Sequence, residues 1–179
     1  MNKRITLTWE IAGIFIISIA GSLMHFVYEL SGRFTPLELI AAVNESTWEH
    51  LKLAVWPFLI FALVEHIFLK KKVKNFLIAK TAGVYLIPIS IVVFFYSYLT
   101  ILGHDSLFLD ISIFIISIVI GQLISYKILI SKKLTGIWNK IAILAMIVCI
   151  VKLFLFTFFP PHMFLFKDPV SGGYGIISR

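Results

Sequence analysis

Apolar residues fill five long segments of the chain, and short polar links separate them. The segments run roughly over residues 7–30, 48–69, 77–101, 108–130 and 138–159. Each is close to the ~20 residues that an α-helix needs to cross the hydrocarbon core of a bilayer. The pattern therefore predicts an all-α fold, a polytopic membrane helix bundle with about five transmembrane helices.

The first link contains a helix signal of its own. Thr35 precedes Pro36, and proline is favoured at the first helical position because its missing N–H needs no partner there. We expect a short interfacial helix over residues 36–43 and an outer tail over residues 160–179. Because all the links are short, residues 1–179 are expected to form a single integral-membrane domain.

The composition supports a membrane protein. The chain has 179 residues, of which 60% are hydrophobic and 14% are charged, and its mean hydropathy is +1.00. A soluble domain of this length cannot bury so much apolar surface, whereas a bilayer solvates it. The Ile-, Lys- and Phe-rich composition favours a prokaryotic origin and hence the plasma membrane.

The basic residues predict how the bundle is oriented. Eleven of the 16 Lys and Arg residues lie before the first segment, or in and beside the links between the second and third segments and between the fourth and fifth. These three regions share one side of the membrane, and an excess of Lys marks the cytoplasmic side. We expect the N-terminus inside and the C-terminus outside. The same placement explains the net charge of +7, and we expect no nucleic-acid partner because the basic residues form no groove.

The stretch "VNESTWEHLK", residues 43–52, concentrates polar groups at the outer mouth of the second segment. Ionisable residues within a membrane protein usually face the bundle interior or an aqueous cavity, and they indicate function. We therefore predict a polar chamber in the outer leaflet. Its residues from this stretch are Asn44, Glu45, Ser46, Glu49, His50 and Lys52.

Other segments bring polar residues to the same side. His25 and Glu29 are one helical turn apart near the outer end of the first segment, and the tail supplies His162 and Asp168. Lys152 lies within the fifth segment, where a lone ammonium costs several kcal/mol unless it is paired. We expect it to pair with Glu29 or Glu49. By contrast, Glu65-His66 lies beside a lysine cluster and is interpreted as solvation or ion pairing at the inner surface.

These residue types favour metal-assisted hydrolysis. His25, Glu29, His50 and His162 are candidate ligands for zinc or another divalent metal, because imidazole and carboxylate groups are its usual protein ligands. Glu45 or Glu49 would activate a bound water, and Ser46 is a candidate nucleophile. The substrate would be a lipid or a small molecule.

Three alternatives remain open at this point. Ser46 and Glu49 fit a helix capping box, which is a structural duty. The chamber also suits a solute- or ion-binding protein, a transporter or a transporter subunit, in which the charged groups hold the ligand. A membrane scaffold for partner proteins is the third reading. Separately, Ser117, Gly121 and Ser125 form a small-residue stripe that favours close helix packing.

The segment from "LMHFVYELSG" through "AVNESTWEHLKLAVWP", together with "FPPHMFLFKDPVSGGYG", resembles an uncharacterised prokaryotic family of small multi-pass membrane proteins. The shared features are an Asn-Glu-Ser-x-Trp-Glu-His block and a Pro-His…Asp-Pro…Gly-x-Tyr-Gly tail. The resemblance implies topology and site positions but no activity. "ESTWEH" is also similar to the Ser-x-x-x-His element of the ceramidase and adiponectin-receptor superfamily of membrane zinc hydrolases. This chain departs from that superfamily, with five segments instead of seven and without its late His-x-x-x-His pair.

Overall fold

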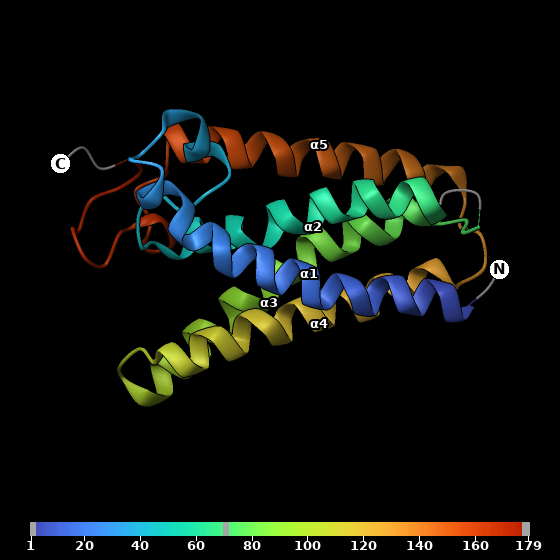
Figure 1. Ribbon diagram of the computed structural model, residues 1–179, viewed down its shortest axis with the longest axis horizontal. Coiled ribbons are helices and arrows are strands. Elements are labelled where there is room, and N and C mark those ends of the chain that lie inside the picture. The colour runs from blue at the N-terminus through green and yellow to red at the C-terminus, as the bar shows by residue number, and fades with distance from the viewer. Residues whose placement is uncertain (1–2, 70–71, 177–179) are drawn as a thin grey trace.

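The computed structural model describes residues 3–69 and 72–176, and five long α-helices dominate this part of the chain (Figure 1). Each of them is long and apolar enough to cross a membrane, so the predicted membrane helix bundle is confirmed. The helices are α1 (Lys3–Leu30), α2 (Thr47–Leu69), α3 (Phe76–Leu102), α4 (Leu107–Leu129) and α5 (Gly136–Phe158).

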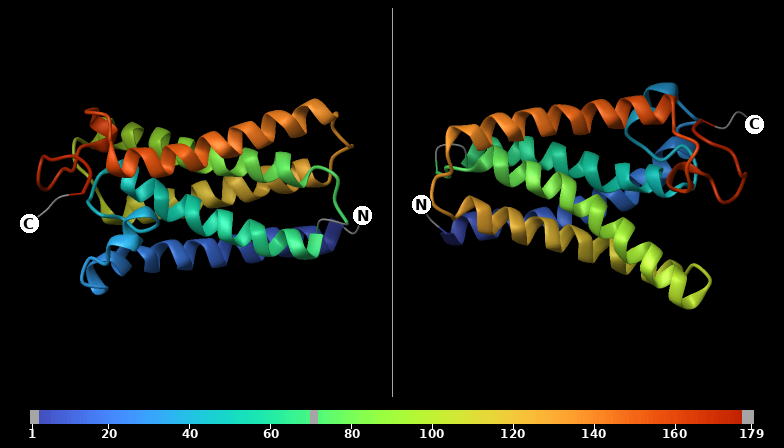
Figure 2. Two further views of the ribbon diagram at one scale, coloured as in Figure 1. Left: turned by 90° about the horizontal axis from the view of Figure 1, so that it is seen from above. Right: turned by 180° about the vertical axis from the view of Figure 1, so that it is seen from behind.

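Helix α2 is the central element of the bundle. In its most apolar stretch 56% of the residues are buried, against 17% in the corresponding stretches of α3 and α5. It packs against α1 and α3, while α4 packs against α1 and α3 and α5 packs against α3. The views in Figures 1 and 2 show the α3–α4 hairpin diverging from α5 toward the end of the bundle that carries the C-terminus.

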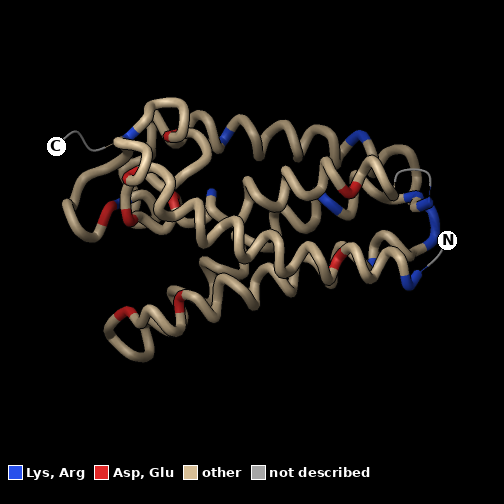
Figure 3. Tube along the Cα trace, viewed as in Figure 1, with Lys and Arg blue, Asp and Glu red and all other residues tan. Residues whose placement is uncertain are grey.

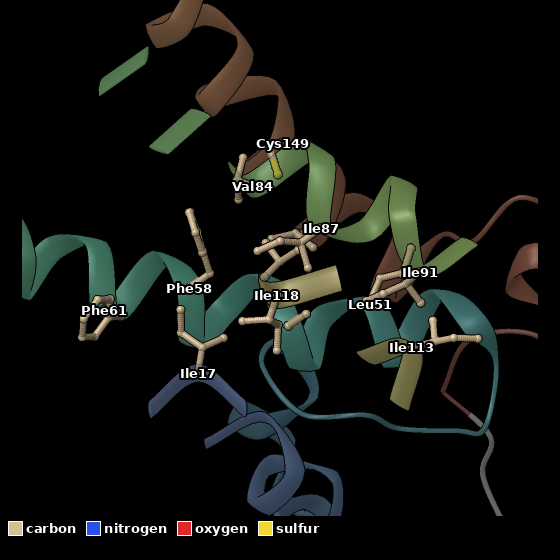
Figure 4. Close-up of a cluster of buried hydrophobic side chains, with 13 residues drawn as sticks. Ile17, Leu51, Phe58, Phe61, Val84, Ile87, Ile91, Ile113, Ile118 and Cys149 are labelled. Atoms are coloured by element: carbon tan, nitrogen blue, oxygen red, sulfur yellow. The ribbon is translucent and has the colours of Figure 1, made fainter. Parts of the chain in front are cut away.

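All five helices contribute to one apolar core (Figure 4). Ile17, Phe58, Ile87 and Ile118 come from α1 to α4 and are at most 1% exposed, and Cys149 joins them from α5. Lipid tails are as apolar as these side chains, so close van der Waals packing, and not transfer out of water, holds the core together. The surrounding exposed isoleucine, leucine and phenylalanine side chains suit a lipid environment.

Small residues allow the helices to approach closely. A Cβ atom added at Gly21 of α1 would lie 2.3 Å from the carbonyl oxygen of Leu53 in α2. The predicted small-residue stripe on α4 is also confirmed as a packing face, since Ser117, Gly121 and Ser125 are buried. The contact at Gly21 fixes the height of α1 against α2, and Gly121 of α4 lies in the same way against Ile87 of α3.

The link between α1 and α2 contains a shorter helix than expected. In place of a helix over 36–43 there is a 3-10 helix, η1, over Thr35–Leu39. Side chains from α2 occupy its carbonyl oxygens, because Lys52 Nζ donates to the Glu38 carbonyl at 2.7 Å and Trp56 Nε1 donates to the Leu39 carbonyl at 2.7 Å. These oxygens are the acceptors that a longer helix would need.

The tail folds back over this link. It contains a second 3-10 helix, η2 (Phe164–Phe166), and a β-bridge between Lys167 and Tyr174. Phe166 is buried against Trp48, with 4.9 Å between the ring centroids. Asn44 Nδ2 donates to the carbonyl oxygen of Gly175 at 2.7 Å, so the described part of the tail is tied to the start of α2.

The charges separate along the bundle axis (Figure 3). Most Lys and Arg residues lie toward the end that carries the N-terminus, which we call the basic end. Most Asp and Glu residues lie at the opposite end, which we call the acidic end and which includes the α1–α2 link, the α3–α4 turn and the tail. Two acids, Glu10 and Glu65, lie in the basic half instead.

Candidate metal site at the acidic end

Three of the predicted polar residues meet where α1 ends and α2 begins. They are His25 of α1, Glu45 of the link and His50 of α2. One ligand atom from each lies within 4.8 Å of the other two. Because α1 and α2 are antiparallel neighbours joined by a short link, residues on either side of that link come together at the same height. Ligand atoms this close can share one metal ion.

His50 is oriented by a backbone contact. Its Nδ1 atom lies 2.9 Å from the carbonyl oxygen of Ser46, one turn earlier in the helix. A carbonyl oxygen only accepts, so Nδ1 carries the hydrogen and Nε2 of the neutral ring is left as a lone-pair donor. Metal-binding histidines usually have this arrangement, in which the second ring nitrogen is fixed by a carbonyl or carboxylate. Nε2 faces Glu45, with 3.4 Å to Oε2.

His25 supplies an unsatisfied nitrogen to the same place. Its ring centroid lies 5.1 Å from that of His50, and its Nδ1 atom is buried without a hydrogen-bond partner among the described residues. A buried polar atom without a partner is unfavourable and calls for an explanation. A metal ion bound between the two rings would provide one.

Glu45 is held in its anionic form. When the His50 ring is protonated, its Nε2–H donates to the Glu45 carboxylate, and this hydrogen bond lowers the pKa of the Glu45 carboxyl below its ordinary value of 4.5 and outweighs the opposing effect of burial. Its backbone N–H donates to Asp168 Oδ1 at 3.3 Å, so the tail fixes this part of the link. An ionised carboxylate beside two imidazoles is a suitable ligand set for zinc.

Asp168 organises the tail at this point. Burial raises the pKa of its carboxyl, but hydrogen bonds outweigh burial and hold the pKa below its ordinary value of 3.8. The donors are the hydroxyl and N–H of Ser171 and the N–H groups of Val170 and Glu45. The distances to the Ser171 hydroxyl and N–H are 2.5 and 3.0 Å. Asp168 therefore anchors the tail as an anion beside Glu45.

A cavity of about 590 Å³ opens beside the three residues. His25, Glu45 and His50 form part of its wall, while its apolar lining comes from all of α1 to α4 and from the tail. This volume is within the range of small-molecule sites. The apolar lining includes Phe26, Leu53, Ile91, Phe95, Ile113, Phe114 and Val170.

The other predicted metal ligands lie outside this group. Glu29 pairs with Arg33 at 2.7 Å, one turn further along the chain. His162 stacks on Tyr174 in the tail, with 4.5 Å between the ring centroids. Neither belongs to the group formed by His25, Glu45 and His50.

Glu49, Ser46 and Lys52 make structural contacts. Glu49 Oε2 lies 2.6 Å from Lys52 Nζ and accepts the N–H of Val43 at 3.1 Å. The Ser46 hydroxyl accepts the N–H of Glu49 at 3.4 Å, as the capping alternative predicts, although Glu49 bonds to Val43 and not back to Ser46. The catalytic roles predicted for Glu49 and Ser46 stay predictions, but both side chains already have partners.

Lys52, and not Lys152, is the ammonium that pairs with Glu49. Lys152 lies on the exposed face of α5. Lys152 was expected to pair with Glu29 or Glu49. The Glu49 alternative is wrong, because Lys152 is exposed on α5, and the ion pair of Glu29 is with Arg33. Lys52 is 0% exposed and also donates to Thr157 Oγ1 at 3.2 Å.

Sequence reasoning missed a second polar cluster, which Glu10, Glu65 and Lys80 form inside the basic half. Glu65 was expected to be solvated or ion-paired at the inner surface. It is ion-paired, but it is buried inside the bundle with 0% of its surface exposed. A signal was present: Glu10 and Lys80 each stand a turn or more inside an apolar helix.

A family model matches residues 1–176, which is nearly the whole chain. The chain belongs to the family of unknown function DUF6512. This match confirms the resemblance to an uncharacterised family. No match was found to a curated protein or to a solved structure.

Proposed function

We propose that this membrane protein is a metal-dependent hydrolase whose metal is held by His25, Glu45 and His50. The observation that carries the proposal is the convergence of three ligand atoms within 4.8 Å of one another on the wall of a cavity. Two imidazoles and one carboxylate are a ligand set of catalytic zinc sites, in which the fourth position is left to water or substrate.

The cavity favours an apolar substrate. A metal ion in this group would lower the pKa of a bound water and make it a nucleophile near neutral pH. The walls next to it are largely aliphatic and aromatic, with Ile91, Phe95 and Phe114 among them. They suit the hydrocarbon part of a lipid or another apolar molecule, with its ester, amide or phosphate group at the metal. We therefore expect a substrate that enters from the membrane.

Elemental analysis of the detergent-purified protein tests the metal site. We expect about one zinc per chain in the wild type and loss of the metal in His25→Ala and in His50→Ala. His66→Ala is the matched control, because His66 is exposed on α2 at the basic end and contacts Phe76. A wild type that stays metal-free after zinc is supplied, or variants that keep the metal, would refute the site.

A solute- or ion-binding protein, or a transporter, is the second candidate. It is favoured by Pro57 and Pro88, which lie inside α2 and α3, since each removes a backbone hydrogen bond within its helix. Prolines within membrane-spanning helices are a feature of secondary transporters, and here both prolines lie inside continuous helices. A transporter or binding protein should be stabilised by its solute in the absence of metal. A membrane scaffold should keep its partner proteins unchanged in His25→Ala and in His50→Ala.

A further inference from the structure

Three charged side chains meet inside the basic half of the bundle, far from the candidate metal site. Lys80 Nζ of α3 lies 2.8 Å from Glu10 Oε1 of α1 and 2.5 Å from Glu65 Oε2 of α2. The three side chains are at most 3% exposed. When all of them are ionised, this cluster carries a net charge of −1.

In the described part of the chain, the ion pairs of Glu10 and of Glu65 are both with this one ammonium. The groups that face the cluster from α4 are Ser125, whose hydroxyl donates to Glu10 Oε1 at 2.8 Å, and Gln122, whose amide donates to the Glu10 carbonyl at 3.3 Å. The rings of Phe58 and Phe76 lie 5.8 and 5.5 Å from Lys80 Nζ. Rings of this kind stabilise the ammonium and not the carboxylates.

Several oxygens of the cluster lack partners. Glu10 Oε2, Glu65 Oε1 and Gln122 Oε1 are buried without a hydrogen bond among the described residues. Gln122 is 0% exposed and lies against α1 beside Glu10. An unpaired charge in a low-dielectric interior is so unfavourable that the group changes its protonation state instead. Two carboxyl groups that compete for one ammonium therefore favour the binding of a proton.

We propose that Glu10, Glu65 and Lys80 form a proton-binding centre in which the two carboxyl groups share one proton beside the Lys80 ammonium. With the proton bound the centre is neutral, and when the proton leaves it carries −1. The shared proton belongs to the pair, because two strongly interacting acids titrate as a unit. A metal cation does not fit this place, since the ammonium already contacts both carboxyl groups and repels it.

The centre joins three helices, so its charge bears on the packing of the bundle. Glu10, Glu65 and Lys80 come from α1, α2 and α3. In the neutral form one ammonium holds both carboxyl groups together. Loss of the proton leaves two carboxylates that repel each other across α1 and α2. The centre thus makes the contact between these helices sensitive to pH, independently of any metal at the acidic end.

Infrared spectroscopy of the purified protein tests the proposal through the C=O stretch of a protonated carboxyl group. We expect one such group per chain in the wild type at neutral pH and none from this cluster in Glu10→Gln or Glu65→Gln. In either variant the remaining carboxylate matches the single ammonium and needs no proton. Glu29→Gln is the matched control, because Glu29 is exposed and pairs with Arg33, and it should keep the signal.

Thermal unfolding over a range of pH provides a second measurement. The folded protein keeps a proton that a glutamate of the unfolded chain has already released. The Tm of the wild type should therefore fall as the pH rises toward the point at which the centre loses its proton and should then level off, while Glu65→Gln should lack this fall. A wild type without a protonated carboxyl group at neutral pH would overturn the proposal. A signal that survives both Gln variants would also overturn it and would assign the proton to another acid. If a variant does not fold, titration of the wild type still decides, because one proton per chain must be released as the signal disappears.

Discussion

Replacing Lys52 with Met should destabilise the folded bundle far more than the same change at Lys152. Lys52 is 0% exposed, and its ammonium contacts Glu49 Oε2 at 2.6 Å, the Glu38 carbonyl at 2.7 Å and Thr157 Oγ1 at 3.2 Å. The contact with Glu49 lies within α2, while those with Glu38 and Thr157 join α2 to η1 and to α5. Methionine has a similar length but makes none of them.

The expected loss follows from what remains after the substitution. Removing one partner of a buried ion pair costs about 3–5 kcal/mol, because the other charge stays buried without compensation. Here that charge is the Glu49 carboxylate, which is 1% exposed and, among the described residues, keeps the hydrogen bond from the Val43 N–H. The double variant Lys52→Met with Glu49→Gln should recover much of the loss, since neither charge remains.

Reversible unfolding of the detergent-solubilised protein, followed by circular dichroism, measures these free energies. Lys152→Met is the matched control, and we expect a change within about 0.5 kcal/mol because Lys152 is exposed on α5. Acidification should restore part of the stability of Lys52→Met by protonating Glu49. Equal effects at the two lysines, or a double variant no more stable than Lys52→Met, would refute the reasoning.

In the tail, Asp168→Asn should weaken the contacts with Ser171 and Glu45, so the backbone amides of residues 164–176 should exchange hydrogen faster by mass spectrometry. The pKa of the Asp168 carboxyl is lowered in the folded protein, so its ionised form stabilises the fold at neutral pH, and this stabilisation is lost as the pH falls through the folded-state pKa. The wild type should therefore have a higher Tm than the variant at pH 7 but not in strong acid. At the α1–α2 contact, Gly21→Ala should cost about 1–3 kcal/mol in the free energy of unfolding, whereas Gly136→Ala, whose new Cβ meets no atom within 4 Å, should not.

The number of long helices could be predicted because the thickness of the bilayer sets the length of each apolar segment. The proximity of His25 and His50 also followed from the sequence, since both lie near the one short link between α1 and α2. Their role as metal ligands stays a prediction until the metal is measured.

The faces of the helices could not be predicted. Apolar side chains surround α2 and α5 on nearly all sides, so the sequence does not indicate which lysine points inward. Lys52 and Lys152 look equivalent as lone ammonium groups within apolar runs, yet one is buried and the other exposed. For the same reason the partners of Lys80 were missed, because Glu10 and Glu65 reach it only through the packing of α1 and α2 against α3.

The α1–α2 hairpin carries both polar sites, at equal spacing on its two arms. From Glu10 to His25 on α1, and from His50 to Glu65 on α2, the interval is 15 residues. At 1.5 Å per residue the sites stand about 22 Å apart on each arm. An axial slide of one arm along the other displaces both pairs by the same distance. The close approach of Gly21 to the Leu53 carbonyl opposes such a slide, so the hairpin holds the two sites at a fixed separation.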